Sequence, residues 1–492
     1  MTTYVAIDIG ASSGRLMQSE KTAAGTMSLT EVHRFKNGFA KVDELNCWQI
    51  EQLINEILRG FAKLKKNGVN TCYVGIDTWG VDYCLIDRAD RLIQPPVSYR
   101  DDRTTAVLEP FFAKWTKENL YQKTGIQIQP FNTVFQLFSE EREKLAQAAK
   151  ILLIPDYLGY VFTGQAVLEQ TNASTTQLMN MDTKELDEEL LQELALEAHR
   201  FAPLVEPGHV LGPLLNERFP EYDLPELTFI TVASHDTASA VVGTPGVGDE
   251  WAFISSGTWS LIGTELAQGN KTAAAFENNF TNEWGIEGTT RFLKNIMGMW
   301  LIQEVARIQN YRYSYAELAH LAQQEPGFVS LINVNEERFL NPVNMINEIQ
   351  QFCEETQQPI PQTAGEVARC IYDSLACCYA LELLQLEKVT NKTFTKLYIV
   401  GGGSNNDFLN QLTANVCQLA LSAGPSEATA IGNLVVQMLA TNELTSLATA
   451  RKWIGQSFDL KEFQPEIAFD YQGVLKHYQS ILEYREEEQK YA

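Results

Sequence analysis

The stretch Asp8-Ile9-Gly10-Ala11-Ser12-Ser13-Gly14-Arg15 follows an apolar, strand-like run, and a similar turn, Ser255-Ser256-Gly257-Thr258-Trp259-Ser260, follows another. Glycine permits tight turns, and the unpaired amides and hydroxyls of such turns attract anions. The two turns open the two halves of the chain, and the isolated pair His235-Asp236 lies before the second. This pattern predicts duplicated domains around a shared phosphate site, with ATP as the expected ligand.

Length and charge narrow the class of protein. The 492 residues exceed what one hydrophobic core usually holds, so we expect at least two domains. With 62 acidic and 38 basic residues, the net charge of -24 opposes binding to nucleic acid or to an anionic membrane. We find neither an apolar run long enough to span a bilayer nor a secretory leader. The sequence therefore predicts a soluble, cytoplasmic protein with small-molecule partners.

The eight cysteines show neither a C-x-x-C pair nor ligand spacing with histidine. We interpret them as reduced thiols, because a reducing compartment disfavours disulfides. A bridge between Cys353 and Cys370 stays open, since spacing alone does not give bridge geometry.

Hydrophobic periodicity predicts the elements around both turns. In the first half, a helix is expected at residues 48–65, and strands at residues 4–9, 15–19, 27–35 and 72–77. In the second half, helices are expected at residues 366–386 and from residue 407, and strands at residues 251–254, 261–264 and 396–400. A hairpin followed by a helix and a strand predicts a mixed sheet with helices on its faces.

Another strand, expected at residues 228–233, leads into His235, and the glycine-rich run at 243–248 is typical of a hinge. We therefore expect an N-terminal domain at residues 1–245 and a C-terminal domain at 246–492. Gly401-Gly402-Gly403-Ser404 forms a third strand-to-helix turn that suits a nucleotide. It lacks the G-x-G-x-x-G spacing, and the chain has no G-x-x-x-x-G-K-[ST] loop, which argues against dehydrogenases and P-loop enzymes.

In this order, the elements resemble the FGGY carbohydrate kinases across essentially the whole chain. The strings that carry the resemblance include AIDIGASSGR (6–15), SHDTASAVVGTP (234–245), SSGTWSLIG (255–263), LKNIMG (293–298) and GPSEATAIGN (424–433). The resemblance implies a two-lobed α/β fold of the actin/Hsp70/hexokinase type, which is ribonuclease H-like, with ATP and sugar in the cleft between the lobes.

Two strings depart from the wider family. The sugar loop has Thr78-Trp79-Gly80-Val81-Asp82, unlike the xylulose and glycerol kinases, and Ile431-Gly432-Asn433 replaces the usual Gly-Ala-Ala. Both departures narrow the resemblance to one branch of the family. The sequence offers no mechanistic reason for Asn433.

The resemblance implies roles for the residues around the sugar. Asp236 would be the catalytic base, because phosphoryl transfer to a hydroxyl needs a carboxylate that accepts its proton. Without the resemblance, an Asp at this place would be interpreted as a turn or capping residue. His235 and Thr237, which flank it, together with Gly80 and Asn295, would contact the sugar.

The nucleotide site follows from the same resemblance. The first phosphate loop would consist of Ala11, Ser12, Ser13, Gly14 and Arg15, with Arg15 offsetting developing charge. Thr258 in the second loop and Gln303, Gly401 and Gly402 would complete the ATP site. Asp8 would hold Mg²⁺ through water, since Mg²⁺ keeps much of its hydration.

The expected reaction is transfer of the γ-phosphoryl group of Mg-ATP to the primary hydroxyl of a ketose. Spacing does not rank the possible ketoses. A non-enzymatic actin-like protein, either a filament former or a sugar-sensing repressor, is the alternative of a different class. A repressor needs a basic helix-turn-helix, and a filament former has no need of His235-Asp236. The sequence leaves the oligomeric state open.

Overall fold

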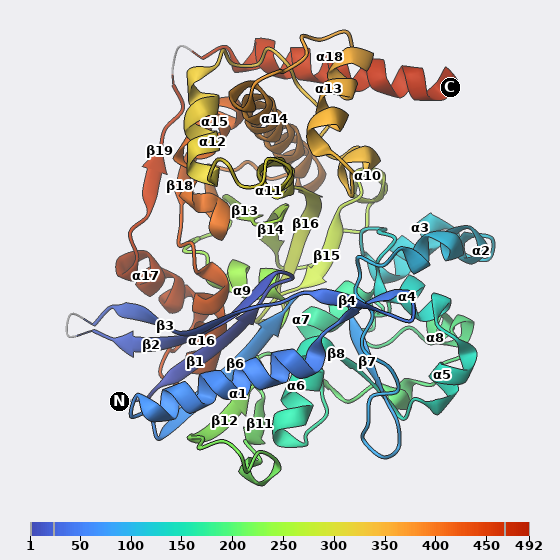
Figure 1. The fold of residues 1–492 in the computed structure, drawn as a ribbon, viewed down its shortest axis with the longest axis vertical. Helices are drawn as coiled ribbons and strands as arrows, with labels where there is room; N and C mark the ends of the chain where they lie inside the picture. Colours follow the sequence, from blue (N-terminus) through green and yellow to red (C-terminus); the bar gives the residue numbers. More distant parts are fainter. Residues whose placement is uncertain (1, 23–24, 467–468, 492) are drawn as a thin grey trace. The chain divides into compact units, whose positions relative to one another are not determined.

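A computed structural model describes residues 2–22, 25–466 and 469–491, and its chain divides into two compact units (Figure 1). The first unit comprises Met1–Pro245, Glu265–Phe292 and Ala428–Phe458, and the second comprises Gly246–Thr264, Leu293–Glu427 and Asp459–Ala492. Two segments from the second half of the chain therefore belong to the first unit. Domain boundaries at residues 245 and 246 stay a prediction.

The first unit contains most of the strands. They are β1 (Tyr4–Ile9), β2 (Ser13–Lys21), β3 (Met27–Lys36), β4 (Phe39–Val42), β5 (Leu45–Trp48), β6 (Thr71–Thr78), β7 (Tyr83–Ile86), β8 (Lys150–Leu153), β9 (Leu168–Glu169), β10 (Leu204–Val205), β11 (Val210–Pro213), β12 (Glu226–Ile230) and β15 (Thr281–Trp284). Its α-helices are α1 (Ile50–Lys66), α2 (Leu108–Phe112), α3 (Lys117–Thr124), α4 (Thr133–Ser139), α5 (Arg142–Gln147), α6 (Ile154–Thr163), α7 (Gln170–Ala173), α8 (Glu188–Glu193), α9 (Asp236–Val242), α10 (Ala273–Glu277), α16 (Ala428–Ala440) and α17 (Leu447–Ser457).

The second unit is richer in helices. Its α-helices are α11 (Trp300–Ile308), α12 (Tyr315–Gln324), α13 (Met345–Glu355), α14 (Ala364–Thr390), α15 (Asp407–Cys417) and α18 (Tyr471–Tyr491). Its strands are β13 (Trp251–Ser256), β17 (Lys396–Val400), β18 (Ala420–Ala423) and β19 (Lys461–Phe463), together with most of β14 (Trp259–Leu266) and β16 (Thr290–Met297).

The same strand arrangement occurs in both units. In the first, β1 pairs antiparallel with β2 and parallel with β6, which in turn pairs parallel with β12. In the second, β13 pairs antiparallel with β14 and parallel with β17, which pairs parallel with β18. Each glycine turn thus joins the two strands of a hairpin whose first strand has a parallel neighbour. The duplicated pattern expected from the sequence is present in the sheets.

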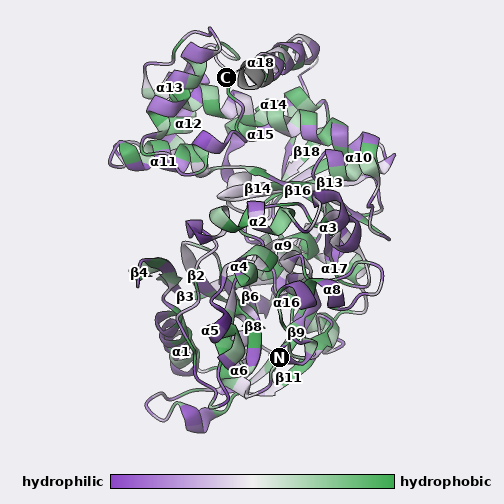
Figure 2. Cartoon of the chain, turned by 90° about the vertical axis from the view of Figure 1, so that its right-hand side faces the viewer, coloured by the Kyte–Doolittle hydropathy of each residue, from purple (hydrophilic) through white to green (hydrophobic). Residues whose placement is uncertain are grey.

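Apolar periodicity explains how helix α1 packs. Leu53, Ile57, Phe61 and Leu64 recur at helical spacing and are fully or almost fully buried. Gly60 lies against Leu16 of β2, so closely that a Cβ atom would come within 2.4 Å of the Leu16 side chain. The mixed colours along the helices in Figure 2 show the same division between apolar and polar positions.

Helices α9 and α16 of the first unit cross at backbone contact distance. A Cβ on Gly432 would lie 1.8 Å from the carbonyl oxygen of Ser239, and one on Gly243 would lie 2.0 Å from that of Ala428. Neither position therefore accommodates a side chain unless the helices separate. Because α9 begins at Asp236, this crossing also fixes the candidate base.

Several element boundaries differ from those expected. The helix expected from residue 48 begins at Ile50, because Trp48 pairs with Phe39 in the β4-β5 hairpin. The helix expected at 366–386 extends over Ala364–Thr390, where Thr363 and Glu366 form a capping box. Strand β12 ends at Ile230, and the amide of Thr231 instead donates to His209 O.

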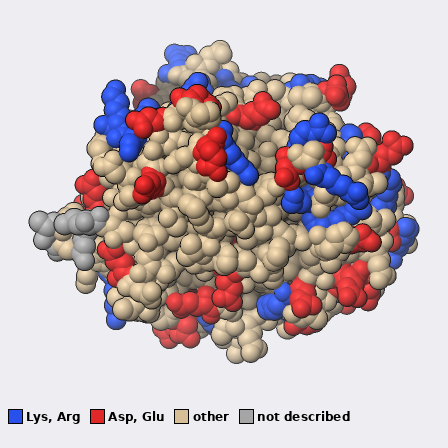
Figure 3. All heavy atoms as spheres, turned by 90° about the horizontal axis from the view of Figure 1, so that it is seen from below, with Lys and Arg blue, Asp and Glu red and all other residues tan. Residues whose placement is uncertain are grey.

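The structure also bears on the expectations from composition. All eight cysteines are free thiols, including Cys353 and Cys370. No helix in the described residues is both long and apolar enough to cross a membrane. On the face shown in Figure 3, acidic and basic side chains are interspersed.

The helix crossing gives a prediction about stability. Gly432→Ala should lower the free energy of unfolding by about 1–3 kcal/mol, because the added methyl group overpacks a backbone contact. Gly455→Ala is the matched control, since the nearest atom to its Cβ would be Pro245 Cβ at 3.7 Å, an ordinary contact. Denaturant unfolding of both variants tests this, and equal stabilities would contradict it.

Candidate active site

The first phosphate turn joins β1 to β2. Gly10 N donates to Ser13 O at 2.9 Å, and Asn37 Nδ2 donates to Gly10 O at 2.8 Å, so β3 and its following residues hold the turn. Ser12 is exposed, and Ala11 and Ser13 are half-buried. Gly14 is buried, and a Cβ there would lie 2.3 Å from the ring of Phe35. Packing against Phe35 therefore accounts for glycine at position 14.

Arg15 and Asp8 lie opposite each other in this hairpin. The guanidinium of Arg15 donates twice to Asp8 Oδ2, from Nε at 3.1 Å and from Nη2 at 2.8 Å. Asp8 is 7% exposed. The sequence predicts both residues in the site but not their pairing, and this contact shows that Asp8 orients Arg15.

Asp77 is a second carboxylate beside Asp8, and the sequence alone does not predict its role. The two residues are register partners on the parallel strands β1 and β6. Asp77 is fully buried, and burial, followed by the negative charge of Asp8, raises its pKa well above the ordinary value. Its Oδ1 has no hydrogen-bond partner in the part of the chain that the structure describes.

Asn433 holds Asp77 from helix α16. Asn433 Nδ2 donates to Asp77 Oδ2 at 2.6 Å, and Asn433 Oδ1 accepts from Gln437 Nε2 at 2.7 Å. Gln437 Nε2 also donates to Val5 O at 3.0 Å, which ties the network to β1. This buried network gives Asn433 the physical reason that the sequence did not reveal.

Asp236 is the first residue of α9, and its side chain is 33% exposed. Thr237 donates to its Oδ1 from the backbone at 2.6 Å and from Oγ1 at 3.2 Å, and His235 Nε2 lies 3.3 Å from the same oxygen. Among the described residues, all three of these contacts are made to Oδ1 of Asp236. Burial, opposed by His235 and aided by the charge of Asp8, raises the pKa of Asp236.

Gly80 lies against His235. A Cβ on Gly80 would be 2.9 Å from Thr175 Oγ1 and 3.4 Å from His235 Cδ2, so only glycine fits without displacing Thr175. The next residue, Val81, has a φ of 68°, an uncommon conformation for a β-branched residue. Thr133 Oγ1 donates to Val81 O at 2.6 Å and stabilises this turn. The structure thus brings together Gly80, His235 and Asp236.

Asp82 anchors the same loop and was not predicted as a functional residue. Its Oδ2 accepts from Trp48 Nε1 at 2.6 Å, Trp79 Nε1 at 2.9 Å and Tyr99 N at 3.0 Å, and its Oδ1 accepts from Gln136 Nε2 at 2.9 Å. Burial raises its pKa to about 6 despite these bonds. Four donors on one buried carboxylate fix the loop that carries Gly80.

The remaining predicted residues lie in the second unit. Thr258 is in the turn between β13 and β14, Asn295 is on β16, and Gln303 is on α11. The turn contacts the start of α11, because Met299 N donates to Gly257 O at 3.0 Å and Trp300 N donates to Thr258 O at 3.1 Å. The structure thereby links the segment of Thr258 to the helix of Gln303.

The triple-glycine turn packs on the end of β13. Gly401 has a φ of 81°, and a Cβ there would lie 2.9 Å from Ser256 O. A Cβ on Gly403 would lie 1.9 Å from Ser256 Oγ. Gly402 has no such neighbour within 4 Å and is exposed. The turn is therefore fixed by its outer glycines and open at Gly402, which suits contact with a flat ligand.

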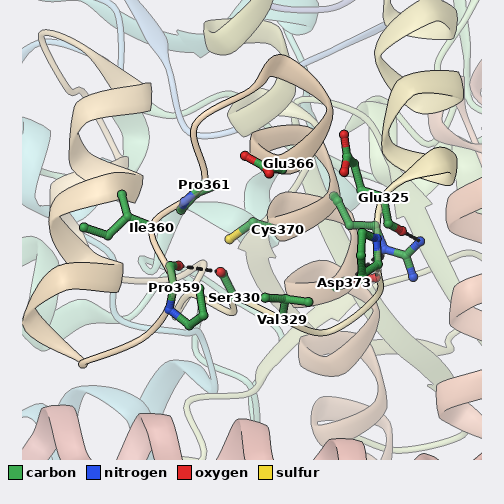
Figure 4. Close-up of a pocket in the computed structure, with 11 residues that line it drawn as sticks. Glu325, Val329, Ser330, Pro359, Ile360, Pro361, Glu366, Cys370 and Asp373 are labelled. Carbon is green, nitrogen blue, oxygen red and sulfur yellow. Dashed lines mark hydrogen bonds and ion pairs between the residues drawn. The ribbon is translucent and has the colours of Figure 1, made fainter.

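The second unit also has a pocket of about 120 Å³ (Figure 4). Its lining residues include Glu325, Ser330, Pro359, Cys370 and Asp373. None of the predicted site residues lines it. Ser330 Oγ donates to Pro359 O at 2.6 Å across part of its wall.

The carboxylates of the first unit suit Mg²⁺ held through water. Carboxylate oxygens are ligands that Mg²⁺ prefers, and Asp77 Oδ1 is a buried oxygen without a hydrogen-bond partner among the described residues. The described residues contain no group of three or more His, Cys, Asp or Glu side chains able to hold a metal directly. Mg²⁺ often binds through one or two carboxylates together with waters and phosphates, and the neighbouring pair Asp8 and Asp77 could supply them.

Comparisons with known proteins agree with this architecture. The N-terminal domain of the FGGY family of carbohydrate kinases matches residues 3–243, and the C-terminal domain of that family matches residues 252–441. The chain belongs to the FGGY family of carbohydrate kinases. The family expected from the sequence is therefore confirmed, and the chain is an ATP-dependent carbohydrate kinase.

Within that family, the chain is 57% identical to a rhamnulokinase of Enterococcus faecalis over 94% of both chains. It is 51% identical to a rhamnulokinase of Bacillus subtilis over 97% of this chain and 98% of the relative. A xylulose kinase of Lactobacillus acidophilus has a similar structure, with a TM-score of 0.80 and 15% identity over 98% of each chain. Plasmodium falciparum glycerol kinase with ADP gives a TM-score of 0.78 and 14% identity over 99% of this chain and 98% of that one. The expected two-domain α/β fold is confirmed.

The raised pKa of Asp82 predicts a pH-dependent stability. Because the folded-state pKa is about 6 and the ordinary value is 3.8, folding favours the protonated carboxyl, and this stability is lost as pH rises through about 6. Asp82→Asn cannot ionise, so its stability relative to the parent should rise by up to about 3 kcal/mol between pH 4 and pH 7. Thermal unfolding of both proteins across this range tests the sign. A difference independent of pH would contradict it.

Proposed function

We propose that the chain transfers the γ-phosphoryl group of ATP to the 1-hydroxyl of L-rhamnulose, giving L-rhamnulose 1-phosphate and ADP in L-rhamnose catabolism. The identity to rhamnulokinases over nearly the whole chain supports this substrate. The structural observation that supports this chemistry concerns Asp236. Its carboxylate is partly exposed, and its hydrogen-bond and ion-pair partners among the described residues all contact Oδ1 rather than Oδ2.

In the proposed reaction, Asp236 Oδ2 accepts the proton of the 1-hydroxyl as the oxygen bonds to phosphorus. His235, Thr237, Gly80 and Asn295 bind and orient the sugar. The raised pKa of Asp236 makes it a stronger base than an ordinary carboxylate.

The phosphate groups have their own proposed contacts. Amides and hydroxyls of Ala11, Ser12 and Ser13 with Gly14 and Arg15 bind the phosphates, while Thr258, Gln303, Gly401 and Gly402 bind the nucleotide. Mg²⁺, when bound with ATP, offsets the negative charge of its phosphates. Asp8 and Asp77 are the residues that would hold its waters.

Of the two alternative functions, one keeps the same chemistry and the other is disfavoured. Another ketose, such as L-fuculose or L-xylulose, would use the same base, because discrimination between sugars depends on a few loop contacts. A non-enzymatic actin-like protein is disfavoured, since the chain belongs to a family of kinases. The partners we propose are therefore ATP and a ketose, and a cytoplasmic location stays a prediction.

ADP release with Mg-ATP across L-rhamnulose, L-fuculose, L-xylulose, D-xylulose and glycerol tests the substrate. We expect a preference for L-rhamnulose, and a loss of about 10²-fold or more in kcat for Asp236→Asn, because a general base typically contributes 10²–10⁴-fold. Preference for another ketose would change the proposed substrate but leave the proposed mechanism unchanged. Turnover unaffected by sugar or by Asp236→Asn would contradict the proposal.

The pH dependence of the reaction tests the base separately. Asp236 acts only when ionised, so kcat/KM for the ketose should fall as pH drops through its raised pKa, at a pH above the ordinary value of 3.8. Quenched ADP assays, limited to the pH range in which the protein stays folded, measure this decline. A flat profile down to the pH of unfolding would argue against Asp236.

A further inference from the structure

Two buried charged residues, Glu283 and Arg291, lie next to His235, and neither is among the residues proposed to bind the sugar, ATP or Mg²⁺. Glu283 is 5% exposed at β15, and Arg291 is 1% exposed near the start of β16. Both belong to Glu265–Phe292, a segment of the first unit. The segment therefore brings a carboxylate and a guanidinium to the candidate catalytic residues.

Arg291 is fixed from several sides. Its Nε donates to Trp284 O at 3.1 Å, and its Nη2 donates to Thr171 O at 3.4 Å. Its Nη1 pairs with Glu283 Oε2 at 2.9 Å and hydrogen-bonds His235 Nδ1 at 3.4 Å. A planar guanidinium held at two backbone carbonyls gives His235 a rigid neighbour.

Two contacts bear on which nitrogen of His235 carries hydrogen: Nε2 lies 3.3 Å from Asp236 Oδ1, a carboxylate oxygen that accepts, and Nδ1 lies 3.4 Å from Arg291 Nη1, which donates. Arginine only donates, so a neutral His235 that accepts from Arg291 at Nδ1 must carry its hydrogen on Nε2. A protonated His235 carries hydrogen on both nitrogens, and Nδ1 then faces Glu283 Oε2 at 3.3 Å. In both of these states, Nε2 donates toward Asp236 Oδ1 at 3.3 Å, whereas a neutral ring with its hydrogen on Nδ1 would set two acceptors, Nε2 and the ionised Oδ1, against each other.

We propose that Arg291 and Glu283 are positioning residues for the reaction: they hold the ring of His235 with its Nε2 hydrogen directed at Asp236 Oδ1, which leaves Oδ2 to accept the proton of the sugar. A Cβ on Gly80 would lie 3.4 Å from the ring, so the same orientation shapes the site on the side of Gly80. This inference rests on the proposed function, because it assigns these residues a role in ketose phosphorylation.

The energetics favour positioning over simple stabilisation. A buried ion pair loses hydration on both partners, and well-packed apolar residues of similar volume are often at least as stable. Burial alone would raise the pKa of Glu283, but the charges of Arg291 and His235 outweigh it and lower the pKa. Glu283 therefore stays ionised and holds Arg291 against His235.

The test compares Glu283→Gln with and without His235→Asn. Glu283→Gln keeps the shape and removes the charge, so kcat/KM for the ketose should fall about tenfold, as expected for a hydrogen-bonded charge, while KM for ATP changes less than about twofold. In the His235→Asn background, the same substitution should change kcat/KM less than about twofold, because Glu283 acts through His235. Calorimetric titration with L-rhamnulose in the absence of ATP gives a second readout, in which Glu283→Gln weakens sugar binding.

Glu265→Gln is the matched control, because Glu265 pairs with the buried Arg451 at 2.6 Å in the same unit, and Arg451 Nη2 donates to Val241 O near the end of α9 opposite Asp236. It should lower thermal stability without changing KM for the ketose. Equal losses from Glu283→Gln in both backgrounds, or no loss in either, would overturn the inference. If Glu283→Gln does not fold, Arg291→Lys, which keeps the charge and loses the planar fork, enters the same cycle.

The proposed function can fail independently. If the unmodified protein phosphorylates none of the five acceptors, the proposed function is wrong. If it prefers another ketose, the same four proteins (the parent, each single variant and the double variant) are measured with that sugar. The inference then depends only on whether the effect of Glu283→Gln disappears in the His235→Asn background.

Discussion

The backbone contact between α9 and α16 is the constraint on which the rest of the candidate site depends. Gly432 and Gly243 allow the two helices to approach until carbonyl oxygens occupy the space of side chains. Asp236 begins α9, and Asn433, next to Gly432, reaches Asp77 on β6. One helix crossing therefore fixes the candidate base and the carboxylate beside Asp8 at the same time.

Buried carboxylates organise the first unit, and they differ in how completely they are satisfied. Glu169 accepts from Ser234 through both N and Oγ and also from the residues that begin α7, so it holds the loop before His235. Asp82 accepts from four donors and holds the loop of Gly80. Asp77 keeps one oxygen without a partner among the described residues. Of these three, Glu169 and Asp82 build the scaffold, and Asp77 is suited to a ligand.

In the second unit, closely packed glycines fix the turns, as buried carboxylates fix the loops of the first unit. Gly298 lies so close to the start of β14 that a Cβ would be 2.6 Å from Trp259 C, and Cβ atoms on Gly401 and Gly403 would lie 2.9 Å and 1.9 Å from atoms of Ser256. These contacts bring backbone rather than side chains to the surface at Gly402. Backbone amides in such turns suit phosphates and flat bases.

The sequence by itself determined the repeated strand and turn pattern, the FGGY family and the candidates Asp236, His235 and Gly80, because these depend on local periodicity and on contiguous strings. It did not find Asp77, Asp82, Glu283 or Arg291, since a buried acidic or basic residue within a strand or loop carries no local signal of its partner. Asn433 stood out in the sequence without a reason, and Asp77, its partner, lies 356 positions away. Only the tertiary structure decided which charges meet, because burial and pairing arise when strands and helices distant in sequence pack together.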